Sequence, residues 1–325
     1  DDLKALLAFS TVSHLGLITM LLGFGTKAAA IAAVFHIINH ATFKAALFMT
    51  AGIVDHETHT RDIKRLGGLR HLMPVTFVIA TVAALSMAGI PPLNGFLSKE
   101  MMLEEVSHTY WLQNPYVLPV LATLAAAFSA AYSFRYIAHV FLGPKRDDYP
   151  AKPHDPGFGM WASPALLVTL VVLIGLFSAR MVGPLVDAAA GAVTQSHPHA
   201  HLKLWHGVTP ALYMSGIAVL GGAVLLALHA GLLRIWNAVP RPEAKVIFDA
   251  LIGAVTDLAR GTTARLHDGS LTRYALIMVT FTLAISVFAY GTGTIGAPTR
   301  ELQAVGLLPL VGWICLIVAT ACIVL

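Results

Sequence analysis

The sequence predicts an all-α protein, a polytopic membrane helical bundle with one proline-broken transmembrane helix. Hydrophobic residues make up 57% of the 325 positions and charged residues 12%, and the mean hydropathy of +0.74 is above that of soluble domains. Several apolar runs reach about 20 residues, the length that crosses a bilayer as a helix. The net charge of +4 is therefore assigned to basic loops at one membrane face, and no nucleic-acid partner is expected.

The first predicted span covers residues 3–24, with Lys4 at its start and His14 inside it. A short turn leads to the second span, residues 31–53, which carries ionisable side chains in its middle. An uncharged helix would be enough to cross the membrane, so these side chains call for an explanation.

His36, His40 and Lys44 recur every four residues in the second span, so they form one polar stripe about 12 Å long on a helix. Ionisable groups inside a bilayer are costly unless they face protein or internal water, so we expect the stripe to point into the bundle. Histidine titrates near neutral pH and has two ring nitrogens, which suits spaced histidines ending on a lysine to relay protons. The alternative is inert polar packing between helices; three ionisable groups in register favour the relay.

The third unit, residues 74–111, is apolar at first and is then interrupted. Pro91, Pro92 and Gly95 lie in the interruption, which cannot continue a regular helix. Broken helices at membrane depth line polar cavities or ion sites in transporters. Lys99 follows the break, and we interpret it as a titratable amine of the site; the alternative is an ordinary loop with a lysine that anchors at the membrane surface.

In the rest of the chain we predict more conventional spans and one amphipathic stretch, residues 243–265. Its apolar residues recur at intervals of three and four residues, as in a helix that lies on a membrane face. The further spans are expected at residues 116–142, 160–182, 208–236, 274–295 and 305–325. We divide the chain into residues 1–142 as the core, 143–240 as additional transmembrane helices, and 241–325 as the surface helix with C-terminal spans.

The distribution of lysine and arginine between the two membrane faces indicates how often the interrupted unit crosses the membrane. If residues 74–111 cross once, most loop lysines and arginines collect on one face; if they cross twice, the two faces become nearly equal. The positive-inside rule therefore predicts a single broken crossing and a cytoplasmic basic face.

Little in the sequence points to an enzyme or to a metal site. The histidine-rich loop HPHAHLKLWH, residues 197–206, has no nearby cysteine or acidic residue to complete a ligand set, so we predict no metal site. The sequence has no Gly-rich phosphate loop, nucleophile elbow or HExxH motif. We expect no enzyme activity in the chain itself and no cofactor.

Four early segments closely resemble the antiporter-like subunits shared by Mrp-type sodium/proton antiporters and respiratory complex I. They read DLKALLAFSTVSHLGL, HIINHATFKAALFMTAG, RDIKRLGGLRHLMPVTF and ALSMAGIPPLNGFLSKE. Later stretches, GPLVDAAAGAV, LWHGV and IFDALIGAVTDLARGTTARLHDGSLTRYALI, are similar to the large A-type subunit of the Mrp complex. A short amphipathic stretch also stands where the largest antiporter-like subunit of complex I has a very long lateral helix.

The resemblance implies roles for particular residues. His36, His40 and Lys44 match the histidine and lysine positions in the second half of the family's inverted repeat, and Lys99 matches a lysine beyond the broken helix that loads protons. Lys4 and His14 match positions on the preceding helix. Protons would pass along His14, His36, His40 and Lys44 to Lys99, with Glu100 or Glu104 as its charge partner.

The resemblance also implies a function and a setting. We expect a subunit of a multisubunit antiporter in the plasma membrane that couples proton movement to export of Na⁺ or another monovalent cation, with other Mrp subunits and the lipid bilayer as partners. The alternative is a proton-pumping membrane subunit of a respiratory NADH-quinone oxidoreductase. We also expect the chain to be a fragment, since the family's first half, with its membrane glutamate and partner lysine, would precede Asp1.

Overall fold

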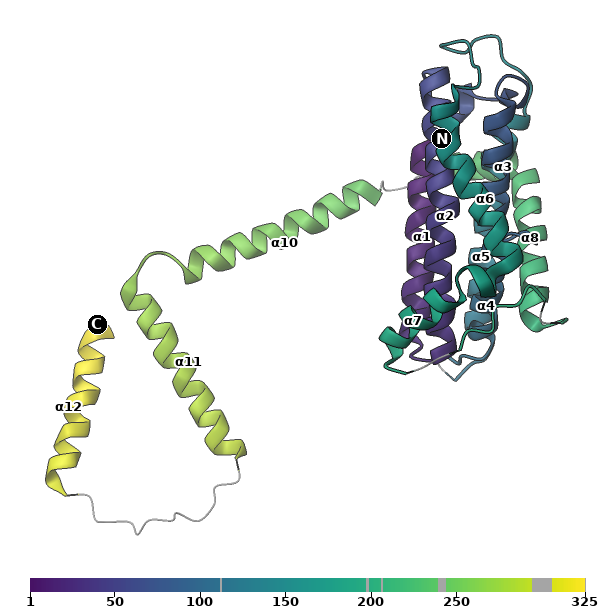
Figure 1. Ribbon diagram of the computed structural model, residues 1–325. Coiled ribbons are helices and arrows are strands. Elements are labelled where there is room, and N and C mark those ends of the chain that lie inside the picture. The colour runs from purple at the N-terminus through teal and green to yellow at the C-terminus, as the bar shows by residue number, and fades with distance from the viewer. Residues whose placement is uncertain (112, 197–198, 206, 239–243, 294–305, 325) are drawn as a thin grey trace. The chain divides into compact units, whose positions relative to one another are not determined.

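The computed structural model describes residues 1–111, 113–196, 199–205, 207–238, 244–293 and 306–324 (Figure 1). These residues are helical and contain no β-strand, only isolated bridges. The α-helices are α1 (Leu3–Gly23), α2 (Lys27–Thr58), α3 (Pro74–Ala88), α4 (Asn94–Ser107), α5 (Val117–Ile137), α6 (Phe158–Met181), α7 (Gly183–Thr194), α8 (Pro210–Ala227), α9 (His229–Ala238), α10 (Ala244–Leu266), α11 (Leu271–Thr292) and α12 (Leu307–Val324). Short segments η1 (Ile63–Arg65), η2 (Leu69–His71) and η3 (Ala138–Leu142) join or extend them.

The predicted membrane bundle is confirmed. Six of the described helices are long and apolar enough to cross a bilayer, and α3 and α12 are shorter apolar helices. The six are Leu3–Gly23, Lys27–Thr58, Val117–Leu142, Phe158–Met181, Pro210–Ala227 and Leu271–Thr292.

The chain forms two compact units, Asp1–Ala238 and Val239–Leu325. The second unit holds α10, which covers the predicted amphipathic stretch, and α11 and α12, which contact each other. The first unit joins the predicted core to the helices after residue 143, because α2 packs on α6 and α5 packs on α8. Parts of the predicted segments lie outside the described residues: 197–198 and 206 in the histidine-rich loop, 243 at the start of the amphipathic stretch, and 294–295, 305 and 325 at the ends of the last two predicted spans.

Helix α2 is the centre of the first unit. It contacts α1, α3, α4, α6 and α7, and it is longer than predicted, with 32 residues. Thr26 caps its N-terminus by accepting a hydrogen bond from the Ala29 amide. A helix surrounded on most sides by other helices can hold polar groups away from lipid, which a peripheral helix cannot.

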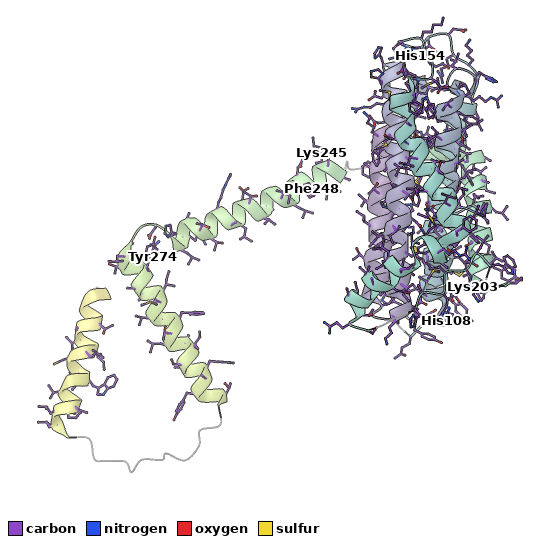
Figure 2. All side chains as sticks on the ribbon, viewed as in Figure 1. His108, His154, Lys203, Lys245, Phe248 and Tyr274 are labelled. Carbon is purple, nitrogen blue, oxygen red and sulfur yellow. The ribbon has the colours of Figure 1, made fainter. Side chains whose placement is uncertain are left out.

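The broken unit crosses the bundle once, as predicted. At the start of α3, the Asp155 carboxylate accepts hydrogen bonds from the amides of Val75 and Thr76. Near the end of α4, Glu105 accepts a hydrogen bond from Thr26, which lies between α1 and α2. Figure 2 shows His154, the neighbour of Asp155, at one end of the bundle and His108, which follows α4, at the other.

The break itself is built from a left-handed glycine and an asparagine. Helix α3 ends at Gly89, whose φ of 88° ends the helix without a side-chain penalty. Asn94 is the first residue of α4, and its side chain hydrogen-bonds to both α3 and α2. Its Oδ1 accepts from Ser86 Oγ of α3 at 2.7 Å, and its Nδ2 donates to Thr42 Oγ1 of α2 at 3.0 Å. The Asn39 amide of α2 donates to the Asn94 carbonyl at 3.0 Å.

Two glycines allow the helices to approach the break. A Cβ added to Gly95 would meet the Ser86 carbonyl, and one added to Gly175 of α6 would meet the Pro92 carbonyl and the Asn94 amide nitrogen. Both added atoms would collide with backbone, which cannot swing aside as a flexible side chain can. The predicted break at Pro91, Pro92 and Gly95 is therefore a packed junction of α2, α3, α4 and α6.

We predict that Gly175→Ala destabilises the protein by about 1–3 kcal/mol, because the new methyl group overpacks the junction. The measurement is the apparent melting temperature of the full-length protein in its complex. Gly159→Ala is the matched control, since it lies on the same helix with open space around it and should be neutral or slightly stabilising. Equal melting temperatures for the two variants would refute the close packing.

We predict that Asn94→Ala lowers stability by about 1–3 kcal/mol for each buried partner that loses its hydrogen bond. The control is Asn114→Ala, which removes one hydrogen bond at an exposed site, to the Tyr116 amide. The same melting measurement checks it, and a wild-type value for Asn94→Ala would mean that the break does not depend on this side chain.

Candidate functional site

The polar stripe of α2 faces other helices. His36 is fully buried and Lys44 is 4% exposed, while His40 is partly buried. The stripe meets α1, which contributes His14, also fully buried. The predicted orientation into the bundle is what the structure shows.

His14 and His36 form the centre of the site. His14 Nδ1 lies 2.9 Å from His36 Nε2, and the two rings stack with centroids 5.2 Å apart. On its other side, His36 Nδ1 lies 2.9 Å from Ser98 Oγ of α4. Both ring nitrogens of His36 are therefore used, so it connects α1 to α4.

His40 completes a group of three imidazoles. Its ring centroid lies 5.2 Å from that of His14 and 6.2 Å from that of His36. Phe43 packs edge-on against all three rings. His14 Nε2 and His40 Nε2 are buried and have no hydrogen-bond partner among the described residues, which is uncommon for buried polar atoms.

The two buried lysines are held by neutral oxygen atoms. Lys44 Nζ donates to Ser10 Oγ and to the Leu7 carbonyl, the latter at 3.3 Å. Lys99, which is 6% exposed, donates to the Met87 carbonyl at 2.6 Å and to Ser129 Oγ at 2.9 Å. Each ammonium is thus bound by one backbone carbonyl and one serine hydroxyl.

The acidic residues near Lys99 occupy different settings. Glu100 is 4% exposed, while Glu104 is half-buried one turn later on α4. Their pairing with Lys99 remains a prediction. Lys4, by contrast, has an acidic partner on α2, because its Nζ lies 2.6 Å from Asp55 Oδ2.

The hydrogen bonds run in a different order from the residue order that the sequence suggests. From His14 they pass to His36 and then to Ser98, the residue before Lys99. Lys44 instead turns towards Ser10 on α1. The roles of these residues, and the order in which protons pass them, stay predictions.

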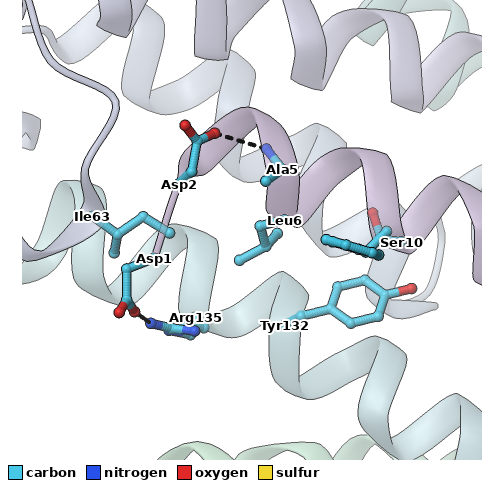
Figure 3. A pocket seen from close by; sticks show the side chains of 9 residues that line it. Asp1, Asp2, Ala5, Leu6, Ser10, Ile63, Tyr132 and Arg135 are labelled. Atoms are coloured by element: carbon cyan, nitrogen blue, oxygen red, sulfur yellow. Dashed lines mark hydrogen bonds and ion pairs between the residues drawn. The ribbon is translucent and has the colours of Figure 1, made fainter. Parts of the chain in front are cut away.

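A cavity of about 330 Å³, here called the access cavity, is lined by Ser10 and Tyr132, which are linked to Lys44 directly and to Lys99 through Ser129 (Figure 3). Ser10, which binds Lys44, is one wall, and Tyr132, whose hydroxyl donates to Ser129 at 3.0 Å, is another. The opposite end carries charged groups, and Figure 3 shows Asp1 paired with Arg135 there. Its lining is Asp1, Asp2, Ala5, Leu6, Phe9, Ser10, Ile63, Tyr132 and Arg135.

Sequence reasoning missed the hydroxyl groups of the site. Ser10, Ser98, Ser129 and Tyr132 had no predicted role, although each lies in an apolar helix or next to one, where a hydroxyl needs a partner. The available signal was spacing: Ser10 precedes His14 by four residues and Tyr132 follows Ser129 by three, so each pair shares one helix face.

Comparison with known proteins gives the family. Residues 1–129 match the family described as NADH:quinone oxidoreductase/Mrp antiporter, TM. The A/B subunit of a probable K(+)/H(+) antiporter from Rhizobium meliloti is 52% identical over 68% of this chain and 22% of its own length. The A1 subunit of a Na(+)/H(+) antiporter from Staphylococcus haemolyticus is 43% identical over 74% of this chain and 32% of its own length.

A solved structure extends the match over the whole chain. A chain of the Mrp complex from Dietzia sp. DQ12-45-1b is similar over 99% of this chain and 34% of its own length, with 34% identity and a TM-score of 0.69. The chain thus spans about a third or less of the length of these relatives. Its residues 1–129 belong to the NADH:quinone oxidoreductase/Mrp antiporter transmembrane family, and the chain as a whole is similar to A-type subunits of Mrp antiporters.

Proposed function

We propose that this chain provides the second half of a proton-translocating core in a multisubunit monovalent cation/proton antiporter of the plasma membrane. Other Mrp-type subunits are its partners, and protons and Na⁺ or K⁺ are its substrates. The names of two relatives support this assignment and differ in the cation, K⁺ in one and Na⁺ in the other.

The observation that carries the proposal is the buried cluster of His14, His36, His40, Lys44 and Lys99. Helices α1, α2 and α4 bring these groups together inside a bundle of membrane-crossing length. Packing alone does not require titratable groups at such a depth, where each one is costly.

The histidines have the geometry of a relay. In the hydrogen bond between His14 and His36, one nitrogen donates and the other accepts, so a proton that arrives on one ring displaces a proton from the far nitrogen of the next. Two charged rings 5.2 Å apart would repel each other by about 3 kcal/mol at an effective dielectric constant of about 20. The cluster therefore favours one extra proton at a time, which passes on rather than accumulating.

The access cavity gives the two lysines a shared route to the surface. A proton in the access cavity meets Ser10, bound to Lys44, and Tyr132, bound through Ser129 to Lys99. A hydroxyl group both accepts and donates a hydrogen bond, so it transfers a proton without carrying a net charge.

Coupling to the cation acts through Lys99. A change in its protonation alters the field at Glu100 and Glu104 on the same helix, and so the affinity of a linked cation site. Na⁺ and K⁺ prefer oxygen ligands and are repelled by ammonium groups, which places cation binding away from the two lysines, on another protein of the complex or among the later helices.

The alternative, a proton-pumping component of a quinone-reducing complex, shares the family and the relay. The A-type relatives and the Mrp structure, which matches 99% of the chain, favour the antiporter. Quinone reductase activity in the purified complex would favour the alternative.

We predict that Lys99→Ala and His40→Ala each reduce sodium-driven proton flux by at least about tenfold, because each removes a group that exchanges protons. Flux is measured in everted vesicles that carry the full-length complex, with assembly checked by purification. Lys99→Arg sharpens the test, since guanidinium keeps the charge but does not release its proton, so it should also be inactive.

Exposed residues provide the controls for these variants: Lys152→Ala and His71→Ala should transport at the wild-type rate. Full transport by Lys99→Ala and His40→Ala would reduce the cluster to packing.

We predict that Tyr132→Phe slows proton flux about fivefold, the equivalent of one neutral hydrogen bond of about 1 kcal/mol. The ring remains, so assembly should not change. Tyr116→Phe, at an exposed position before α5, is the control. Wild-type flux in Tyr132→Phe would show that Lys99 is reached by a route other than the access cavity.

A further inference from the structure

A second cavity lies where α5 ends, and its lining is rich in positive charge. It has a volume of about 230 Å³ and is here called the basic cavity. It lies between the loop after α2, the π-helical segment η3 and α9, and its polar lining includes Asp1, Lys64, Arg135, His139, Arg146 and His229. None of the sequence motifs discussed above predicts it.

Positive charge exceeds negative charge in this cavity. Lys64, Arg135 and Arg146 are cations, and the carboxylate in the lining belongs to Asp1. That carboxylate is already shared, because Asp1 Oδ2 lies 3.0 Å from Lys64 and Asp1 Oδ1 lies 2.5 Å from Arg135. An anion could therefore bind here without displacing a one-to-one ion pair.

Two buried side-chain nitrogen atoms in the cavity lining are unused: one is a donor, and the imidazole nitrogen donates or accepts according to its tautomer. Arg135 Nε and His139 Nδ1 are buried and have no hydrogen-bond partner among the described residues. Buried polar atoms are nearly always hydrogen-bonded, so such a pair beside a cavity indicates a bound group. His229 faces His139 with ring centroids 5.3 Å apart and adds a further polar wall.

The backbone holds this wall in place. Gly67 and Gly68 have φ values of 149° and 64°, and a Cβ on Gly68 would collide with the backbone of Lys145. The loop therefore packs directly on the segment that carries Arg146, whose Nε donates to the Leu66 carbonyl at 2.9 Å. The Arg146 guanidinium is thus fixed at the cavity before any ligand arrives.

We propose that the basic cavity binds the phosphodiester of an anionic phospholipid headgroup. Guanidinium groups match phosphate oxygens in charge and in geometry. The cavity adjoins the end of Val117–Leu142, a segment long and apolar enough to cross a bilayer, and basic pockets between helices at a membrane face attract anionic lipid. The partly exposed Leu233 in its lining suits the apolar part of a lipid, which inorganic phosphate lacks.

The test uses the purified full-length complex in phosphatidylcholine-containing detergent, to which phosphatidylglycerol, more phosphatidylcholine or inorganic phosphate is added. Binding is measured by the rise in apparent melting temperature and by lipid retention in native mass spectrometry. Phosphatidylglycerol should stabilise the wild type, and zwitterionic phosphatidylcholine should not.

Arg146→Gln should weaken phosphatidylglycerol binding roughly tenfold, the loss expected for a charge-assisted hydrogen bond. Arg65→Gln makes the same charge change at an exposed position of the loop after α2, outside the cavity lining, and should bind as the wild type does. If Arg146→Gln fails to assemble, His229→Leu tests the opposite wall, with a loss of about fivefold, that of one neutral hydrogen bond.

Wild-type lipid binding in Arg146→Gln, or in His229→Leu where that variant is used, would overturn the proposal. Equal protection by inorganic phosphate would assign the cavity to a soluble anion and would also overturn the lipid assignment. Antiporter activity does not enter these measurements, so the result stands apart from the proposed transport function.

Discussion

The structure depends on how two ammonium groups are kept inside a membrane-crossing bundle. Lys44 and Lys99 lie on different helices, yet each binds one backbone carbonyl and one serine hydroxyl. The Leu7 carbonyl lies inside α1, so Lys44 shares this oxygen with the helix. The last carbonyls of a helix have no partner within the helix, so a helix that ends inside the bundle offers a free acceptor. Met87 is in the last turn of α3, and the break after it supplies the acceptor for Lys99.

This requirement explains the packing around the break. The chain must turn within the bundle, and the turn exposes polar backbone: Ser86 Oγ accepts from the Gly95 amide, and Asn39 donates to the Asn94 carbonyl. The Asn94 side chain in turn accepts a hydrogen bond from the Ser86 hydroxyl. The turn also brings backbone close to backbone, which Gly95 and Gly175 permit. The broken helix gives the buried Lys99 its acceptor, and the small residues around the break allow the chain to turn there. The lysine and the small residues therefore depend on each other.

The sequence predicts much of the fold and part of the site. Apolar run length predicts the spans, and Pro91 and Pro92 predict the break, because both are local properties. Spacing of four places His36, His40 and Lys44 on one face for the same reason. Partners across helices are not local: nothing in the spacing says that His36 binds His14 and Ser98, or that Ser10 binds Lys44. Those contacts depend on how the helices are rotated against each other, which packing decides.

Helix α5 shows why the missed residues matter. Ser129, Tyr132, Arg135 and His139 follow one another at intervals of three and four, so they form a second polar stripe, from the hydroxyl at Lys99 to the basic cavity. Arg135 lines both the access cavity and the basic cavity. A substitution of Arg135 therefore changes both cavities and cannot distinguish proton transfer from anion binding. Arg146 lines the basic cavity and not the access cavity. A proton route and an anion site can therefore share one helix and still be separated, because their other walls come from different parts of the chain.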